Sequence, residues 1–141
     1  MRRNMKDGKI QYTAGYKYQT YHDYSLQTQI TGYDVDTEFI KLTPWGMLTI
    51  WRGYAWDGAS GPTMDTKSSM RGSLVHDALY QLLREEKISQ HYRKLADEML
   101  RDICIEDGMW AWRARLWYSG VRRLAMSAAN AENEKKVITA P

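Results

Sequence analysis

A histidine and an aspartate are adjacent in the middle of a predicted helix that covers about residues 68–84. His76 lies four positions before Tyr80, so the two side chains share one face of that helix. Asp77 points about 100° away from them, toward a different neighbour. Removing such polar groups from water is costly unless each one has a partner, and this cost is the physical reason to suspect a functional site.

An acidic residue on the following helix is placed to be that partner. A loop of about four residues after Glu85 turns the chain back, so the second helix runs antiparallel to the first. His76 and Asp97 lie about equally far from this loop, and at about 1.5 Å per residue their side chains reach similar heights. We expect Asp97 to accept a hydrogen bond from one nitrogen of His76, which leaves the other nitrogen able to take a proton from water.

A loop with several special residues precedes this helix. The segment Trp56–Pro62 combines two glycines, a serine, an aspartate and a proline, which is typical of a structured loop that presents backbone groups to a ligand. Asp77, on its separate face, could bind a hard cation together with carbonyl oxygens from this loop. A plain connection between a sheet and a helix is the alternative, and the sequence does not decide between the two.

The histidine and its partners also fit a purely structural role. A buried polar network can tie two helices together without doing chemistry, and helix geometry alone favours that interpretation. His22 and His91 lack comparable neighbours, so we interpret both as surface histidines.

The first part of the chain has the alternating pattern of strands. Apolar and polar residues alternate before about residue 62, and after it the apolar spacing becomes helical. The segments 34–42 and 47–54 predict a hairpin, and segment 9–21 adds a further candidate strand. We therefore predict a small antiparallel sheet at about residues 9–55.

Three helices are predicted after a loop at about residues 56–67. Their expected ranges are about 68–84, 89–106 and 109–129. The first carries one apolar stripe, formed by Met70, Leu74, Ala78 and Leu82. The third carries a seam at alternating spacings of four and three, formed by Trp110, Ala114, Trp117, Val121, Leu124 and Ala128. Core packing of its tryptophans is the favoured interpretation of that seam.

The chain length of 141 residues suits one domain. We predict that residues 1–131 form it and that residues 132–141 are a flexible polar tail. The predicted fold class is α+β, with a small N-terminal antiparallel sheet followed by a half that contains three helices.

The net charge of +3 is mild, but the basic residues are unevenly spread. Between Gly108 and Met126 there is no acid, and there are four arginines, namely Arg113, Arg115, Arg122 and Arg123. Such a segment permits contact with an anionic surface. Nucleic-acid binding is disfavoured, because these arginines do not line a single face and no known motif surrounds them.

Cysteine usage and hydropathy exclude several classes of protein. The single cysteine, Cys104, cannot form an internal disulfide and is expected to be a small core residue, which excludes a disulfide-built secreted scaffold. The basic N-terminus lacks a following apolar segment, so no Sec-type signal peptide is expected. No transmembrane segment is expected either, because no apolar run approaches about 18 residues.

Two resemblances follow from these motifs. The first covers roughly residues 24 to 120 and is to a family of small bacteriophage and prophage proteins whose function is not established. It is carried by Tyr54–Pro62, Arg71, Val75–Tyr80 and Ala96-Asp97. This resemblance implies a location in the host cytoplasm or the virion, and a phage or host protein as a partner.

The second resemblance is to phospholipase A₂, in the disulfide-free form found in parvovirus capsid proteins. It is carried by His76-Asp77-x-x-Tyr80 and by the Ala-Asp pair that ends at Asp97. The resemblance implies a phospholipase A₂-like helical half in which His76 is the general base, Tyr80 and Asp97 orient it, and Asp77 binds calcium. The calcium loop of the family would correspond to residues 57–62, with oxygens from Asp57, Gly58 and Ser60. This loop departs from the glycine spacing of the family, and the sheet that precedes it is another departure.

Two functional hypotheses remain close to even. One is a hydrolase, optionally assisted by calcium, that cleaves a phospholipid or a related ester through His76 and rests its third helix on a lipid surface. The other is a non-enzymatic phage protein, such as a virion component, an assembly factor or an inhibitor of a host protein. The hydrolase is slightly favoured.

Overall fold

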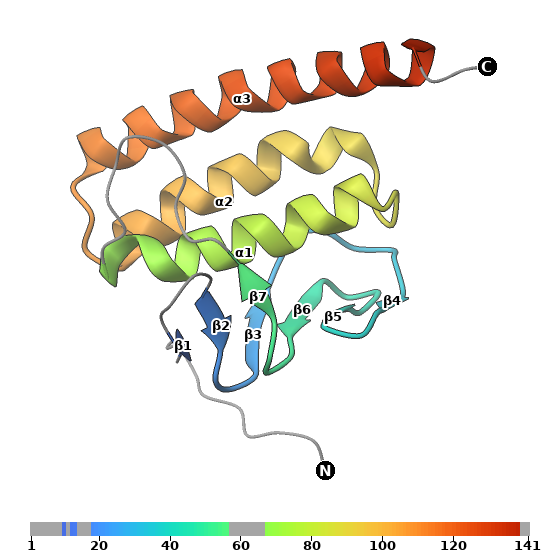
Figure 1. The fold of residues 1–141 in the computed structure, drawn as a ribbon. Coiled ribbons are helices and arrows are strands. Elements are labelled where there is room, and N and C mark those ends of the chain that lie inside the picture. The colour runs from blue at the N-terminus through green and yellow to red at the C-terminus, as the bar shows by residue number, and fades with distance from the viewer. Residues whose placement is uncertain (1–9, 11, 14–17, 57–66, 139–141) are drawn as a thin grey trace.

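The computed structural model describes residues 10, 12–13, 18–56 and 67–138, and within these ranges it shows the predicted α+β order of strands followed by helices (Figure 1). The strands are β1 (Tyr12–Thr13), β2 (Tyr18–Thr20), β3 (Tyr24–Gln27), β4 (Val35–Asp36), β5 (Ile40–Leu42), β6 (Met47–Ile50) and β7 (Ala55–Trp56). The helices are α1 (Lys67–Arg84), the short 3₁₀ helix η1 (Gln90–Tyr92), α2 (Arg93–Glu106) and α3 (Ala111–Ile138).

The strands form two antiparallel sheets where the sequence predicted one. The larger sheet has the order β3-β6-β5-β4, and it contains the predicted hairpin as the β5–β6 pair. The smaller sheet has the order β1-β2-β7, in which Tyr18 pairs with Trp56. Alternating hydrophobicity identifies strands but not their partners, so this long-range pairing could not be read from the pattern.

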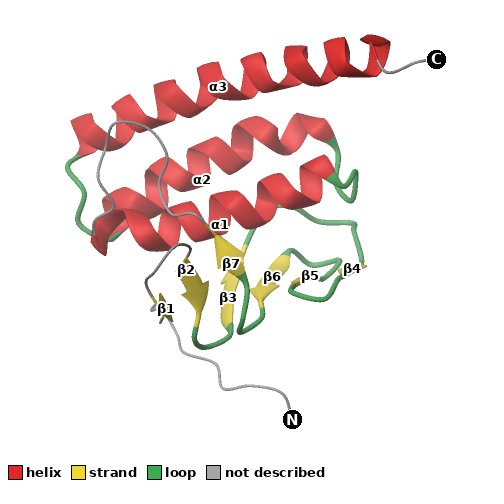
Figure 2. Cartoon of the chain, in the orientation of Figure 1, coloured by secondary structure: helices red, strands yellow, loops and turns green. Residues whose placement is uncertain are grey.

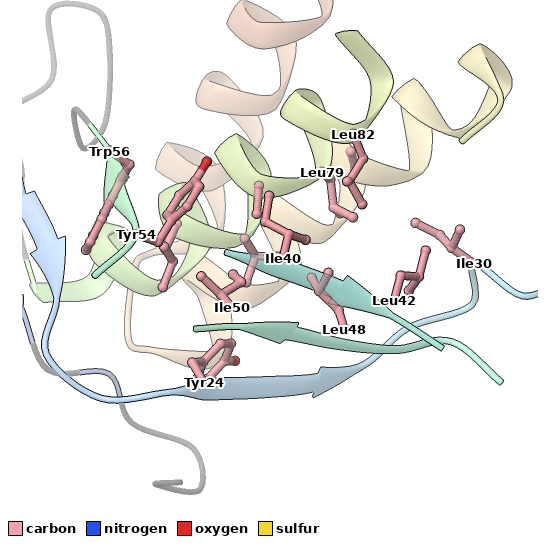
Figure 3. Close-up of a cluster of buried hydrophobic side chains, with 14 of the residues drawn as sticks. Tyr24, Ile30, Ile40, Leu42, Leu48, Ile50, Tyr54, Trp56, Leu79 and Leu82 are labelled. Carbon is pink, nitrogen blue, oxygen red and sulfur yellow. The ribbon is translucent and has the colours of Figure 1, made fainter. Parts of the chain in front are cut away.

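The core lies between the larger sheet and α1 (Figure 3). On β6, Leu48 and Ile50 are fully buried on the face toward the core, whereas Met47 at the start of the strand is exposed; Thr49, on the same side as Met47, is also buried, and its hydroxyl bonds with that of Ser25. Leu79 and Leu82 of α1 belong to the same buried cluster. Burial of these side chains, at about 25 cal/mol per Å² of apolar area, is the main force that docks the sheet on the helix.

Helix α1 is the central layer of the molecule. The sheets lie on one side of it and α2 on the other, with α3 beyond α2 (Figure 2). The four residues of the predicted stripe are all buried, and so are Val75, Leu79 and Leu83. These additional residues are buried because the helix is covered on two sides. His76 and Tyr80 lie on the face toward α2 and are half-buried.

The α1–α2 contact depends on a glycine. A Cβ atom at Gly72 would lie 2.8 Å from the Sγ of Cys104 and 3.2 Å from the carbonyl oxygen of Leu100. Cys104 is buried, as predicted, and burial raises the pKa of its thiol to about 12, so the thiol is a neutral packing group. The absence of a side chain at Gly72 lets the two helices approach closely enough for residues on them to share hydrogen bonds.

We expect Gly72→Ala to destabilise the protein by about 1–3 kcal/mol, because the new methyl group displaces atoms of α2. Urea unfolding measures the change. Gly120→Ala is the matched control, since a Cβ there meets nothing within 4 Å. That substitution should stabilise the helix by about 0.5–1 kcal/mol through reduced backbone entropy in the unfolded state. Equal stability of the two variants would contradict the close contact.

The buried side chain of Arg71 fixes the end of α2 against the sheet. Arg71 is 6% exposed, and its Nε and Nη2 donate to the two oxygens of Asp107, each at 2.9 Å. Its Nη1 donates to the hydroxyl of Tyr24 at 2.8 Å, and Glu106 forms a further ion pair with it. The bond with Asp107 is the main reason that the pKa of Arg71 is raised. Gly108, with a φ of 104°, then ends the turn.

Helix α3 is the outermost layer and contacts α2 (Figure 1). Ala114 is buried and Trp117 and Val121 are half-buried, as the predicted seam requires. The other two seam residues with described side chains break the prediction, because Trp110 is 71% and Leu124 is 59% exposed. Both lie at the ends of the seam, Trp110 before the first residue of the helix and Leu124 about one turn after Val121, so α2 covers the middle of the seam and not its ends. Across the described residues, no helix is both long enough and apolar enough to cross a bilayer.

The helix also continues to Ile138, where the sequence predicted an end near residue 129. Alanine, glutamate and lysine are frequent in this stretch, and their high helix propensity is consistent with the extension.

Candidate functional site

The carboxylate of Asp97 is the centre of a polar cluster between the helices. Asp97 lies on α2 and its side chain is fully buried. Its Oδ1 accepts hydrogen bonds from Nε2 of His76 and from the hydroxyl of Tyr80, both at 2.7 Å. The hydrogen bond that the sequence predicted between His76 and Asp97 is therefore present. It follows from the helical spacing of His76 and Tyr80 and from the antiparallel return of α2.

A fourth residue, which the sequence analysis did not single out for this role, completes the cluster. Nη1 of Arg122, on α3, donates to Oδ2 of Asp97 at 2.7 Å. The side chain of Arg122 is 30% exposed, so the ion pair joins the buried carboxylate to a partly exposed residue. Three donors from two helices thus converge on one buried carboxylate of a third helix, which is how a buried charge is kept at acceptable cost.

The rings of His76 and Tyr80 lie against each other. Their centroids are 4.2 Å apart at an angle of 31°, and the guanidinium carbon of Arg93 lies 5.8 Å from the centroid of Tyr80. Burial, and then the hydrogen bond to Asp97, raises the pKa of Tyr80 above its usual value. Tyr80 is therefore a neutral hydrogen-bond donor over the whole physiological pH range.

The second nitrogen of His76 is the group available for chemistry. Nε2 must carry the proton when it donates to Asp97, and Nδ1 is then a proton acceptor. Within the described part of the chain, no residue forms a hydrogen bond with Nδ1. The side chain of His76 is 12% exposed. A histidine held in one tautomer by a buried carboxylate is the usual arrangement of a general base.

Asp77 does not join this cluster. It is half-buried on another face of α1, and its charge contributes, after burial, to raising the pKa of Tyr54. Asp57, Gly58 and Ser60, the other predicted calcium ligands, lie outside the described residues. Among the residues that are described, no group of three histidine, cysteine or acidic side chains is placed to hold a metal ion.

The fit to calcium therefore depends on a single described carboxylate, whereas calcium takes about six to eight oxygen ligands. If residues 57–62 supply the others, calorimetric titration with calcium should show binding that Asp77→Asn removes. Asp102→Asn, a change at an exposed acid on α2, should leave that binding intact. An absence of heat up to millimolar calcium would contradict the predicted site.

The structure places a cavity of about 390 Å³ at the turn between α1 and α2. It is lined by Tyr33, Glu86, Lys87, Ile88, Ser89 and Gln90. His76 is not among these residues, so this cavity is separate from the cluster.

These features define an α+β domain in which a carboxylate on α2 holds a histidine and a tyrosine of α1 and an arginine of α3. Comparison of the chain with protein-family models, with curated proteins and with solved structures gave no significant match. The two resemblances based on motifs therefore stay hypotheses, and the functional proposal is based on the geometry of the site.

Proposed function

We propose that the chain is a hydrolase of phage type that uses His76 as a general base to cleave a phospholipid or a related ester. The observation that carries this proposal is the 2.7 Å hydrogen bond between Nε2 of His76 and the buried carboxylate of Asp97. That bond directs the basic lone pair of the imidazole to Nδ1.

The reaction needs one water molecule and one proton acceptor. Nδ1 of His76 takes a proton from water as the water oxygen attacks the ester carbonyl carbon. The resulting tetrahedral intermediate collapses with cleavage of the bond to the alcohol oxygen, and His76 returns the proton to the departing alkoxide. Asp97 stabilises the imidazolium that forms between the two proton transfers, and Tyr80 and Arg122 hold Asp97 in place. No step is assigned to a metal ion.

Tyr80 and Arg122 are positioning residues in this scheme. Arg122 balances the charge of Asp97 in the resting state, so the site is incomplete unless α3 is docked on α2. In the phage setting that the motif resemblance suggests, such an enzyme would act in the host cytoplasm or as part of the virion.

A comparison of ester-linked and ether-linked phospholipids tests the proposal. The protein should release fatty acid from ester-linked phospholipid or from a simple ester, and nothing from the ether-linked analogue, because only the ester offers a carbonyl carbon to water. Mass spectrometry of the products identifies the bond that is cleaved. If no phospholipid or simple ester is cleaved, the proposal fails.

A non-enzymatic phage protein is the second candidate, and one observation favours it. Both oxygens of Asp97 are satisfied by residues from the two other helices, which is what a purely structural tie would require. In that case the protein would act as a virion component, an assembly factor or an inhibitor of a host protein, and the cluster would only hold the helices together.

A further inference from the structure

The side of α3 that faces away from α2 has an unusual composition. The covered and the exposed residues of this helix lie on opposite faces, and Ala114 and Val121 lie on the covered face. We use the term outer face for four exposed residues at positions i, i+3, i+4 and i+11, namely Trp112, Arg115, Leu116 and Arg123, which span about 100° of the helix opposite Ala114 and Val121.

The apolar side chains of the outer face are more exposed than a water-facing helix requires. Trp112 is 61% and Leu116 is 64% exposed. Trp110, just before the helix, is 71% exposed, and its ring centroid lies 6.3 Å from that of Trp112. Single exposed apolar residues are ordinary, but a tryptophan pair followed by a leucine one turn along the same helix forms an apolar patch of the kind that marks an interaction site.

The charges of the outer face all have one sign. Arg115 and Arg123 are exposed, and the segment from Gly108 to Met126 contains no acidic residue. Arg122, by contrast, lies toward the covered side and is paired with Asp97. The outer face therefore combines apolar side chains with positive charge that no acidic residue of the segment 108–126 offsets. An ordinary solvent-facing helix side mixes charges of both signs and few large apolar groups.

We propose that the outer face of α3 binds the surface of an anionic phospholipid bilayer, with the helix lying parallel to the membrane plane. Trp110 and Trp112 enter the interfacial region, where the amphipathic indole ring is favoured. Leu116 buries its side chain at the acyl boundary. Arg115 and Arg123 remain at the level of the headgroups and contact phosphate.

Two other occupants fit the outer face less well. A second copy of the chain would bring two positively charged faces together, since an isologous contact places the same patch on both sides. A nucleic acid would bind the arginines through its phosphates but would leave the tryptophans and Leu116 in water, because the backbone of a duplex offers phosphates and not an apolar layer. An anionic bilayer matches both properties of the face.

Co-sedimentation with vesicles of ether-linked lipids tests the proposal independently of the proposed hydrolysis, because these lipids contain no acyl ester. The wild-type protein should bind vesicles that contain phosphatidylglycerol and not vesicles of phosphatidylcholine alone, and added salt should weaken the binding. The double substitution Arg115→Gln with Arg123→Gln should reduce the partition coefficient by about tenfold or more. Trp112→Ser with Leu116→Ser should reduce it by a similar factor.

Matched controls use exposed residues elsewhere in the fold. Trp45→Ser removes a tryptophan that is 77% exposed at the turn between β5 and β6, and Arg52→Gln with Lys94→Gln removes two charges at exposed positions. Both controls should bind as the wild type does, and the melting temperature of every variant should be unchanged.

Two results would overturn the proposal. One is equal binding of the outer-face variants and the controls, or no binding at all. The other is that no form of the protein binds vesicles, whereas the wild type forms a dimer in sedimentation velocity or a complex with duplex DNA. The outer-face variants would then lose that dimer or complex. Hydrolytic activity is measured separately, so binding without activity would support the membrane surface while contradicting the proposed hydrolase.

Discussion

Replacement of His76 by glutamine is expected to lower ester hydrolysis by about 10²–10⁴-fold, the usual contribution of a general base. A glutamine amide nitrogen can reach about the position of Nε2 and can still donate to Oδ1 of Asp97, so the buried carboxylate keeps its partner. An amide cannot take up a proton near neutral pH, so only the chemical role is lost. We therefore expect a melting temperature close to that of the wild type, and both quantities should be measured on the same samples.

The comparison with His76→Ala separates the structural role from the chemical one. Alanine removes the donor as well as the base, so it should lose the same activity and also destabilise the fold by about 1–3 kcal/mol. His91→Gln is the matched control, since His91 is exposed and, among the described residues, hydrogen-bonds with Ser89 at the start of η1 and stacks on Tyr92. Activity that survives in His76→Gln would show that the imidazole is not the base and would leave the structural role.

The contact between His76 and Asp97 could be predicted from the sequence because it depends on local rules. Helical spacing puts His76 and Tyr80 on one face, and a short turn sets the height of Asp97 on the next helix. The structure realises this geometry through the close approach at Gly72. Nothing in the apolar pattern of α1 or α2 indicates that glycine contact, but the hydrogen bond needs only the heights of the two residues and the antiparallel direction.

Arg122 could not be assigned to the cluster in the same way. It is one of four arginines in a short stretch, and only the rotation of α3 against α2 decides which of them points at Asp97. The sequence does contain a partial signal, because Arg122 follows Val121 on the covered side of the helix. The predicted seam was too imprecise to use this signal. It placed Trp110 and Leu124 against α2, and both are exposed in the structure.

The same distinction explains the sheet. The β5–β6 hairpin is a local pairing with a short turn, and its register, Ile40 opposite Ile50, puts both apolar residues on the buried face. The β2–β7 pairing joins residues far apart in the chain, and no alternation of side chains indicates it. The salt bridge from Arg71 to Asp107 is equally long-range, so its structural role was not predicted.

Substitution of Asp97 by alanine is expected to destabilise the fold by about 3–5 kcal/mol, which is a large part of the stability of a small domain. The change leaves the guanidinium of Arg122 without its carboxylate and removes the acceptor of both His76 and Tyr80. These donors lie between packed helices, where water replaces the lost partner poorly. Urea denaturation gives the free energy of unfolding, and Asp102→Ala is the matched control. That acid is 64% exposed and pairs with the neighbouring Arg101, so its loss should change stability by less than about 0.5 kcal/mol.

A double-mutant cycle with Arg122→Ala then apportions the loss. If the ion pair is a main part of the cluster, Asp97→Ala should cost less when Arg122 is already absent, and the coupling energy should be about 1 kcal/mol or more. The remainder belongs to His76 and Tyr80, whose donors lose an acceptor in either background. A stability of Asp97→Ala equal to that of Asp102→Ala would mean that the helices pack without the cluster. Together with retained hydrolysis in His76→Gln, it would remove the physical reason for assigning any role to this site.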